Sequence, residues 1–332
     1  MMKKVWMLSL GLATIIGLSG ILTDTKALPG YNQDSITKTR TDQLRSYQDF
    51  SISQNPIPIL RTYYDYMIGG YNGNPLQLIP SPNGTSYMMT YHGSRAATSS
   101  RRVFYAHIEN GSLISSNTIT ESINPVGYPS LVVDPVLGIP LYTFHGNYDA
   151  DTPMEVKFVS DAFLGGIAGL FNEQLLVDNP LTIVSGSTTT TDNTFLWPIV
   201  TTGPSPIAGH RRVYVLCTNA TGHSSSSPGN PLIARADFDA SDIAAGTHLV
   251  WSYTTVPELN AWNIDPTTQR RTQLTILADA AGNVYLCGYH ETTYGDNQIP
   301  EIDIIKSGNY GTETWTRSSF PTTVSSWNPP AA

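Results

Sequence analysis

The feature that most constrains the fold of this chain is a short phrase that occurs four times. SYMMTYHG (86–93), IPLYTFHG (139–146), VYVLCTNA (213–220) and VYLCGYHE (284–291) share one pattern of β-branched, aromatic and small residues. Each copy follows one apolar run that ends in a turn and precedes two more. Short runs rich in Val, Ile, Tyr and Thr between turn residues predict strands. We therefore expect an all-β chain built from repeats of four strands.

Four strands for each repeat, at a period of roughly 50 to 75 residues, indicate the blades of a β-propeller. Four units are legible between residues 76 and 328, and residues 56–70 add either an isolated strand or the remains of a fifth blade. The sequence thus predicts a β-propeller domain over 56–332. It is either a small propeller closed by its N-terminal strand or part of a larger one.

The N-terminal segment predicts export. Two lysines precede an apolar run from Val5 to about Leu22, and small residues follow at Thr25 and Ala27, which is typical of a cleavable signal peptide over 1–27. Residues 28–55 are polar and lack a strand pattern, so we expect a flexible leader. No later apolar stretch approaches the roughly 20 residues that span a bilayer. We expect a secreted or cell-surface protein, with the periplasm as an alternative.

The charge balance disfavours two classes of partner. The chain carries a net charge of -8, and charged residues make up 13% of it, whereas nucleic acids and anionic membranes select basic surfaces. A neutral, hydroxyl-rich surface instead suits a glycan or an extracellular protein. We expect a monomer without a cofactor.

Several motifs carry a resemblance. The succession GYPSLVVDP, LWPIVTTGPSP, HRRVYV, WSYTTVPELNAWN and SWNP resembles a group of secreted bacterial propeller proteins of uncharacterised activity, some of which end in a C-terminal sorting domain. More distantly, the chain is similar to sialidase-like propellers with Asp-box repeats. SGNYGTETW (307–315) is a degenerate Asp box, with Asn309 in place of the aspartate. Such a box stabilises a hairpin and implies the fold rather than an activity.

Four residues of the repeated phrase are candidate ligand contacts. Alternate residues of a strand share a face, and second strands of propeller blades end at the face that commonly binds ligands. Neutral imidazoles and an amide there could bind a sugar, a peptide or a metal ion. Alternatively, each side chain satisfies a backbone group of the neighbouring blade. These candidates are His92, His145, Asn219 and His290.

Acidic residues in the loops suggest one metal site. Asp149 and Asp151 alternate in NYDADTP after His145, and alternating carboxylates suit a structural Ca²⁺. DFDASD (237–242) looks similar, but turn and cap chemistry explains it more simply.

Cys217 and Cys287 lack a metal or redox spacing. We expect Cys217 on the histidine-bearing face of its strand and Cys287 on the opposite face of the equivalent strand in the next repeat. The two side chains would then face each other across two packed blades. Packed sheets lie about 10 Å apart, which is too far for a disulfide. We expect buried free thiols.

Three functions remain open. The first is an exported binding module for a glycan or a surface protein, without catalysis. The second is a sialidase-like or other glycan-cleaving hydrolase, suggested by the pairs Arg101-Arg102, Arg211-Arg212 and Arg270-Arg271. These pairs fall on different strands of their blades, which disfavours one carboxylate clamp. The third is a structural module of a longer surface protein.

Overall fold

A computed structural model of the chain describes residues 56–64, 73–80, 85–120, 125–148, 154–181, 194–219, 231–261, 273–294 and 297–319. The chain divides into two units at Pro58. Of the first unit, only residues 56–58 are described, and they form neither helix nor strand. All described helices and strands belong to the second unit, from Ile59 onward.

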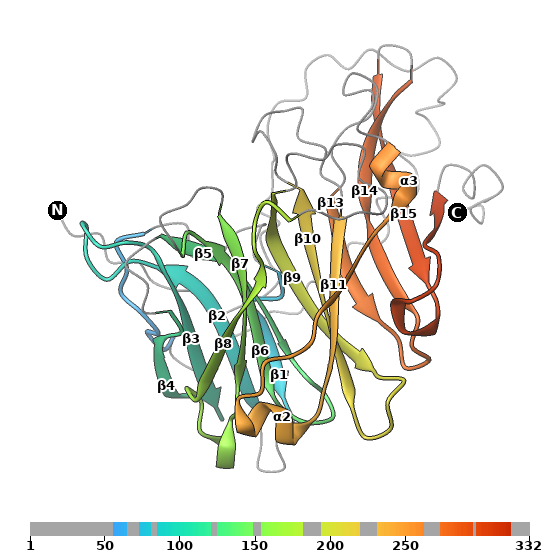
Figure 1. Cartoon of the computed structure of the whole chain (residues 1–332). Coiled ribbons are helices and arrows are strands. Elements are labelled where there is room, and N and C mark those ends of the chain that lie inside the picture. Colours follow the sequence, from blue (N-terminus) through green and yellow to red (C-terminus); the bar gives the residue numbers. More distant parts are fainter. Residues whose placement is uncertain are drawn as a thin grey trace, which may run out of the picture. The chain divides into compact units, whose positions relative to one another are not determined.

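Four antiparallel sheets of four strands follow one another along the chain, and each strand pairs with its sequence neighbour (Figure 1). Such sequential sheets are the blades of a β-propeller, as the repeats predict. Blade 1 holds β1 (Leu76–Ile79), β2 (Ser86–Gly93), β3 (Arg102–Glu109) and β4 (Ser112–Thr118). Blade 2 holds β5 (Val126–Val133), β6 (Pro140–Gly146), β7 (Glu155–Asp161) and β8 (Phe171–Val177). Blade 3 holds β9 (Phe195–Pro204), β10 (Arg211–Asn219), β11 (Pro231–Phe238) and β12 (Ser252–Thr255). Blade 4 holds β13 (Gln273–Ala278), β14 (Val284–Tyr294), β15 (Asn297–Ser307) and β16 (Thr316–Ser319).

The described helices are short. They are α2 (Ala240–Ala245), α3 (Pro257–Ala261) and the 3-10 turns η1 (Leu164–Gly166) and η3 (Asn309–Gly311). Residues 56–64 form no strand, but the backbone N–H of Tyr63 donates to the carbonyl of Ser94, just after β2.

Turn chemistry fixes the hairpins within the blades. Between β3 and β4, Asn110 and Gly111 have φ angles of 47° and 75°, the two consecutive positive values of the Asn-Gly hairpin turn. Between β5 and β6, the Asp134 carboxylate accepts from the backbone N–H groups of Val136 and Leu137. Between β13 and β14, Asp279 accepts from the backbone of Ala281 and of Asn283. Short polar side chains thus replace the missing ladder partners at the strand ends.

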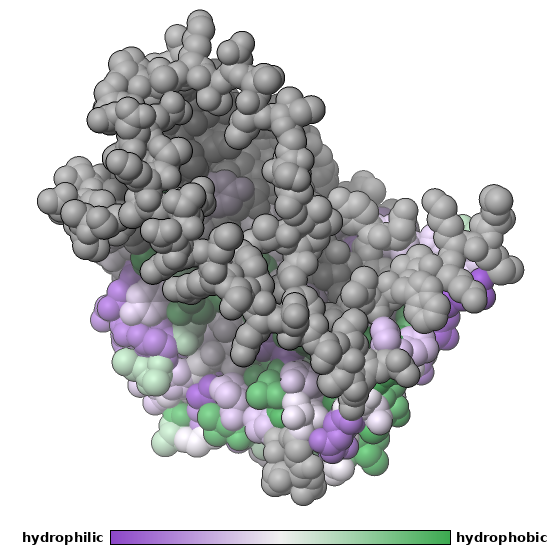
Figure 2. Space-filling view, turned by 180° about the vertical axis from the view of Figure 1, so that it is seen from behind, coloured by the Kyte–Doolittle hydropathy of each residue, from purple (hydrophilic) through white to green (hydrophobic). Residues whose placement is uncertain are grey.

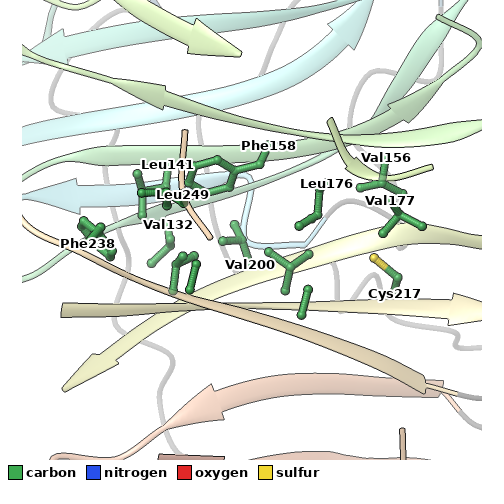
Figure 3. Close-up of a cluster of buried hydrophobic side chains, with 14 of the residues drawn as sticks. Val132, Leu141, Val156, Phe158, Leu176, Val177, Val200, Cys217, Phe238 and Leu249 are labelled. Atoms are coloured by element: carbon green, nitrogen blue, oxygen red, sulfur yellow. The ribbon is translucent and has the colours of Figure 1, made fainter. Parts of the chain in front are cut away.

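Among the described residues the hydrophobic core forms three clusters, and each lies between two successive blades. One cluster joins blades 1 and 2 through residues such as Met88, Val103, Leu131 and Tyr142. The cluster between blades 2 and 3 is drawn in Figure 3 and includes Leu141, Phe158, Val200, Cys217 and Phe238. The third joins blades 3 and 4 through Tyr214, Leu216, Ile276, Leu286 and Trp315. Burial between blades therefore holds the fold together. In these clusters blades 2 and 3 bury both faces of their sheets, and blades 1 and 4 bury one face each.

Polar and apolar residues are interspersed over the described part of the surface that Figure 2 shows. Within the described residues, no helix is long and apolar enough to cross a membrane. Several of the largest exposed apolar side chains lie on turns or connections between strands: Val136, Leu164, Ile167, Ile207 and Val250.

Candidate functional site

The ends of β2 and β6 carry the first two candidate residues, as the repeat predicts. Met88 belongs to the core between blades 1 and 2, and Leu141 to the core between blades 2 and 3. Because side chains alternate along a strand, His92 faces blade 2 and His145 faces blade 3. Both imidazoles are buried, with exposed fractions of 1% and 2%.

Two matching β-bulges lie opposite these strand ends. In blade 2, Gly127 pairs with His145 and Ser130 with Thr143, so Tyr128 and Pro129 together oppose one residue. Blade 3 repeats this arrangement, since Trp197 and Pro198 lie between the pairs Leu196–Thr218 and Ile199–Leu216. Tyr128 and Trp197 have φ angles of 55° and 51°, which side chains other than glycine adopt uncommonly. A bulge turns such a residue out of the regular ladder.

Each bulge is bonded to a histidine of the preceding blade. The backbone N–H of Tyr128 donates to Nδ1 of His92 at 3.0 Å. Likewise, the N–H of Trp197 donates to Nδ1 of His145 at 3.1 Å. These bonds fix Nδ1 as the acceptor. The alternative prediction, that these side chains satisfy backbone groups of the next blade, is therefore confirmed for His92 and His145.

The rings of these residues form one continuous series, which we call the aromatic row: Tyr64, His92, Tyr128, His145 and Trp197. Successive ring centroids lie 5.0, 5.2, 4.9 and 6.2 Å apart. Three of these four contacts are edge-to-face, a favoured geometry for aromatic pairs. The histidines are buried, whereas the tyrosines and the tryptophan are half-buried. The row thus presents partly exposed rings supported by buried imidazoles.

Arg101 adds a positive charge to the aromatic row. Its guanidinium carbon lies 5.5 Å from the centroid of Tyr64 and 5.0 Å from that of Tyr128. Its Nε donates to the carbonyl of Val126, and Nη1 donates to the hydroxyl of Tyr64. Cation–π contacts and hydrogen bonds therefore hold the guanidinium between the two rings.

Asn219 and His290 do not occupy positions equivalent to His92 and His145. The bulge shows that Thr218, which pairs just before Trp197, corresponds to His145. In blade 4, Leu286 belongs to the core shared with the preceding blade, whereas Leu141 of blade 2 belongs to the core shared with the following blade. The alternation along β14 therefore puts Tyr289, not His290, in the phase of His145. The sequence alignment of these two repeats is wrong by one residue, because the phrase itself does not reveal where each strand begins to pair. Asn219 is buried, and the side chain of His290 lies outside the described residues.

The strand faces seen in the structure also correct the predicted orientation of the two cysteines. Cys217 lies in the core between blades 2 and 3. Leu286 lies in the core between blades 3 and 4, so its neighbour Cys287 faces away from blade 3. The two sulfurs therefore look in opposite directions, not toward each other. Both are free thiols, as predicted, although Cys287 is only partly buried.

The candidate calcium ligands Asp149 and Asp151 lie outside the described residues. The similar segment DFDASD forms a helix cap, as the simpler explanation predicts. Asp239 is the N-cap of α2 and makes a reciprocal capping box with Asp242. His210, Asp239 and Asp242 lie near one another, but this capping accounts for both carboxylates.

The described arginine pairs make structural contacts within and between blades. Nε of Arg211 donates to Asp134 of blade 2 at 2.8 Å. Arg212 instead forms a bidentate pair with Asp237 and donates to the carbonyl of Tyr310 in blade 4. Arg102 donates to the carbonyl of Thr120. Arg270-Arg271 lies outside the described residues.

No protein-family model and no curated protein matches this chain. Among solved structures, it is similar to a Hadza microbial sialidase, with 10% identity and a TM-score of 0.38 over 74% of this chain and 46% of that one. A GH43 β-1,3-galactosidase with galactodeoxynojirimycin matches at 9% identity and a TM-score of 0.39, covering 74% of this chain and 76% of that one. An exo-1,5-α-L-arabinanase from a bovine ruminal metagenomic library matches at 11% identity and 0.35, covering 72% and 76%. The chain spans less than half the length of the sialidase chain it matches.

Sequence reasoning singled out the histidines and missed the residues that they hold. Tyr64, Tyr128 and Trp197 complete the row, and the two bulges share a local signal. Tyr128-Pro129 and Trp197-Pro198 are both an aromatic residue followed by proline at the start of a first strand. Proline cannot donate to a ladder, so this repeated pair could have marked the bulges.

Proposed function

We propose that this chain is an exported propeller that binds a carbohydrate at the aromatic row and does not catalyse its cleavage. One observation carries the proposal: half-buried rings of Tyr64, Tyr128 and Trp197 come from three separate segments and are held by buried histidines. Aromatic side chains offer a flat apolar face together with a polar group at the edge. This combination suits the apolar face and hydroxyl rim of a sugar ring.

The arrangement also lowers the entropic cost of binding. Each exposed ring is fixed by a neighbouring imidazole, and the backbones of Tyr128 and Trp197 are fixed by hydrogen bonds. A binding surface that is already ordered loses less conformational entropy when the ligand binds. Arg101, held between two rings, supplies hydrogen-bond donors for hydroxyl or carboxylate groups. His92 and His145 then act as positioning residues, and Asn219 and His290 remain proposed ligand contacts.

A hydrolase is the second candidate. Glycosidases need two carboxylates on either side of the scissile bond. Several described carboxylates instead hold turns at the opposite ends of the strands. Asp134, Asp161 and Asp279 each accept from two or more backbone N–H groups. This use of carboxylates favours binding over cleavage.

The remaining parts of the proposal rest on the sequence. Export rests on the signal-peptide pattern of residues 1–27, and the leader over 28–55 and the domain over 56–332 rest on composition and repeats. A calcium ion at Asp149 and Asp151 would be structural. We propose a monomer whose partner is a neutral glycan, with an extracellular protein or a structural role in a longer protein as the alternatives.

A glycan array followed by calorimetry tests the proposal. Two adjacent tyrosines provide a matched pair, because Tyr64 belongs to the aromatic row and Tyr63, 60% exposed, does not. We expect Tyr64→Ala to weaken binding of the array hit about tenfold or more, and Tyr63→Ala to leave it unchanged. In Trp197→Asn the ring is lost, but asparagine tolerates a positive φ, so the fold is kept and binding falls. Equal losses in Tyr63→Ala and Tyr64→Ala would refute the row as the binding surface.

Chromatography of the array hit after prolonged incubation with the protein separates binding from cleavage. We expect the oligosaccharide to remain intact. Shorter products that disappear in a heat-denatured control would establish the hydrolase instead.

A further inference from the structure

A concave site lies between blades 1 and 2, at the opposite ends of the strands from the aromatic row. Ser86 begins β2, which ends at Gly93 beside His92, and Glu109 ends β3. These residues line a pocket with a volume of about 450 Å³. This volume is within the range of small-molecule sites, which are commonly apolar clefts with a few convergent polar groups.

The polar groups of the pocket converge on His107. Nε2 of His107 lies 2.9 Å from Oγ of Ser86. Both side chains are buried, with exposed fractions of 4% and 3%. Nδ1 of His107 is buried and has no hydrogen-bond partner among the described residues. A buried polar atom without a partner is costly, and a ligand or water in the pocket would remove this cost.

One wall of the pocket is an apolar loop with a fixed conformation. Phe163, Gly165 and Gly166 line the pocket, and the Phe163 ring meets the His107 ring edge-on at 5.3 Å. The Asp161 carboxylate holds this loop, because it accepts from the backbone N–H groups of Phe163, Gly169 and Leu170 at 3.0, 2.7 and 3.1 Å. The wall is therefore formed before any ligand arrives.

The charge of the pocket selects the ligand. Its described lining contains the carboxylate of Glu109 and no lysine or arginine. Burial lowers the pKa of His107, so the imidazole is neutral at physiological pH and contributes no positive charge. Ile79, Leu137 and Phe163 provide apolar surface beside these groups. The Glu109 carboxylate and the Phe163 ring line the same pocket, and both kinds of group attract an organic cation.

We propose that this pocket binds a small organic ammonium ion, with its nitrogen near Glu109 and Ser86 and its alkyl part against Phe163 and Leu137. The site is independent of the aromatic row, so its failure or success does not bear on carbohydrate binding. The ammonium group donates to the carboxylate in a charge-assisted hydrogen bond, and its carbon chain replaces water on the apolar wall.

Isothermal titration of the full chain with three four-carbon probes tests the site. Butylammonium carries the charge, 1-butanol is its neutral counterpart, and butyrate carries the opposite charge. We expect saturable binding of butylammonium at millimolar concentrations and about tenfold weaker binding of butanol and butyrate. Butanol binding as tightly as butylammonium would overturn the proposal, because apolar contact alone would then explain the site.

Two charge-removing variants locate the binding. Glu109→Gln keeps the size of the side chain, and we expect it to weaken butylammonium binding about tenfold while butanol is unaffected. Glu313→Gln removes the same charge from an exposed position in blade 4 and should change nothing. The ring signals of ¹⁵N-labelled His107, assigned with His107→Gln, should shift on addition of butylammonium. Equal affinity in the Glu109→Gln variant, or an unchanged His107 signal, would also overturn the proposal.

Discussion

Nδ1 of His92 accepts a 3.0 Å hydrogen bond from the backbone N–H of Tyr128, a residue of the following blade with a φ angle of 55°. This one bond ties two blades together and holds an aromatic residue in an uncommon backbone conformation. The histidine therefore has two roles: its Nδ1 accepts this hydrogen bond, and its ring packs against Tyr64 and Tyr128. Substitutions can distinguish the two roles.

His92→Asn should be tolerated better than His92→Ala. The amide oxygen of asparagine can take the place of Nδ1, whereas alanine leaves the N–H of Tyr128 without its partner, at a cost of about 1–3 kcal/mol. Urea denaturation monitored by fluorescence measures the difference. Both variants lose the imidazole that supports Tyr64 and Tyr128, so both should weaken carbohydrate binding. Equal stability of the two variants would show that the hydrogen bond contributes nothing.

The ion pair between Arg211 and Asp134 should be worth far more than a surface pair. Asp134 is fully buried and the Arg211 side chain is 15% exposed, and breaking a buried pair costs about 3–5 kcal/mol. Arg211→Met should therefore destabilise the chain strongly. Lys157→Met is the control, since Lys157 pairs with the 38% exposed Glu173 and such pairs contribute about 0–1 kcal/mol. In the double variant Arg211→Met/Asp134→Asn, part of the loss should be recovered, because the buried carboxylate is then neutral.

Gly127→Ala should disturb the aromatic row directly. A Cβ atom there would lie 2.5 Å from Nε of Arg101 and 2.7 Å from Nδ1 of His92. Both side chains would have to move, so stability and carbohydrate binding should fall together. Gly138→Ala is the control: its Cβ would meet no atom of the described residues within 4 Å, but its φ of 70° makes the substitution strained. This control should cost about 1 kcal/mol and leave binding unchanged.

Because of His107, the free energy of unfolding should decrease in acid. Burial lowers its pKa below the ordinary value of 6.5, so the unfolded chain takes up a proton more readily than the folded one. The stabilising contribution is complete above pH 6.5 and is lost as the pH falls through the folded pKa. Asp161 acts in the opposite direction, because burial raises its pKa. Comparison with His107→Gln isolates the histidine: the variant should show a smaller loss of unfolding free energy between pH 6.5 and 5. Parallel profiles would contradict the assignment.

The repeat pattern was sufficient to predict the blades, because strand alternation and turn residues are local properties. Leu141, Thr143 and His145 could be assigned to one face on this basis, and the core clusters confirm that Leu141 lies on the face opposite to Tyr142. Asn219 could not be placed correctly, since its position relative to His145 depends on where β10 starts to pair with β9. The aromatic row was missed for a related reason. Tyr64, Tyr128 and Trp197 come from three separate segments, and only packing of the blades brings them together.

Arg211 and Arg212 are neighbours in the chain, yet they reach in opposite directions across β10. Arg211 bonds to Asp134 in blade 2, and Arg212 bonds to the carbonyl of Tyr310 in blade 4. A local opening of blade 3 would therefore break contacts on both sides at once. This couples the unfolding of three blades, whereas a repeat array with weak junctions opens one unit at a time. Native-state hydrogen exchange should accordingly show blades 2, 3 and 4 losing protection as one cooperative unit.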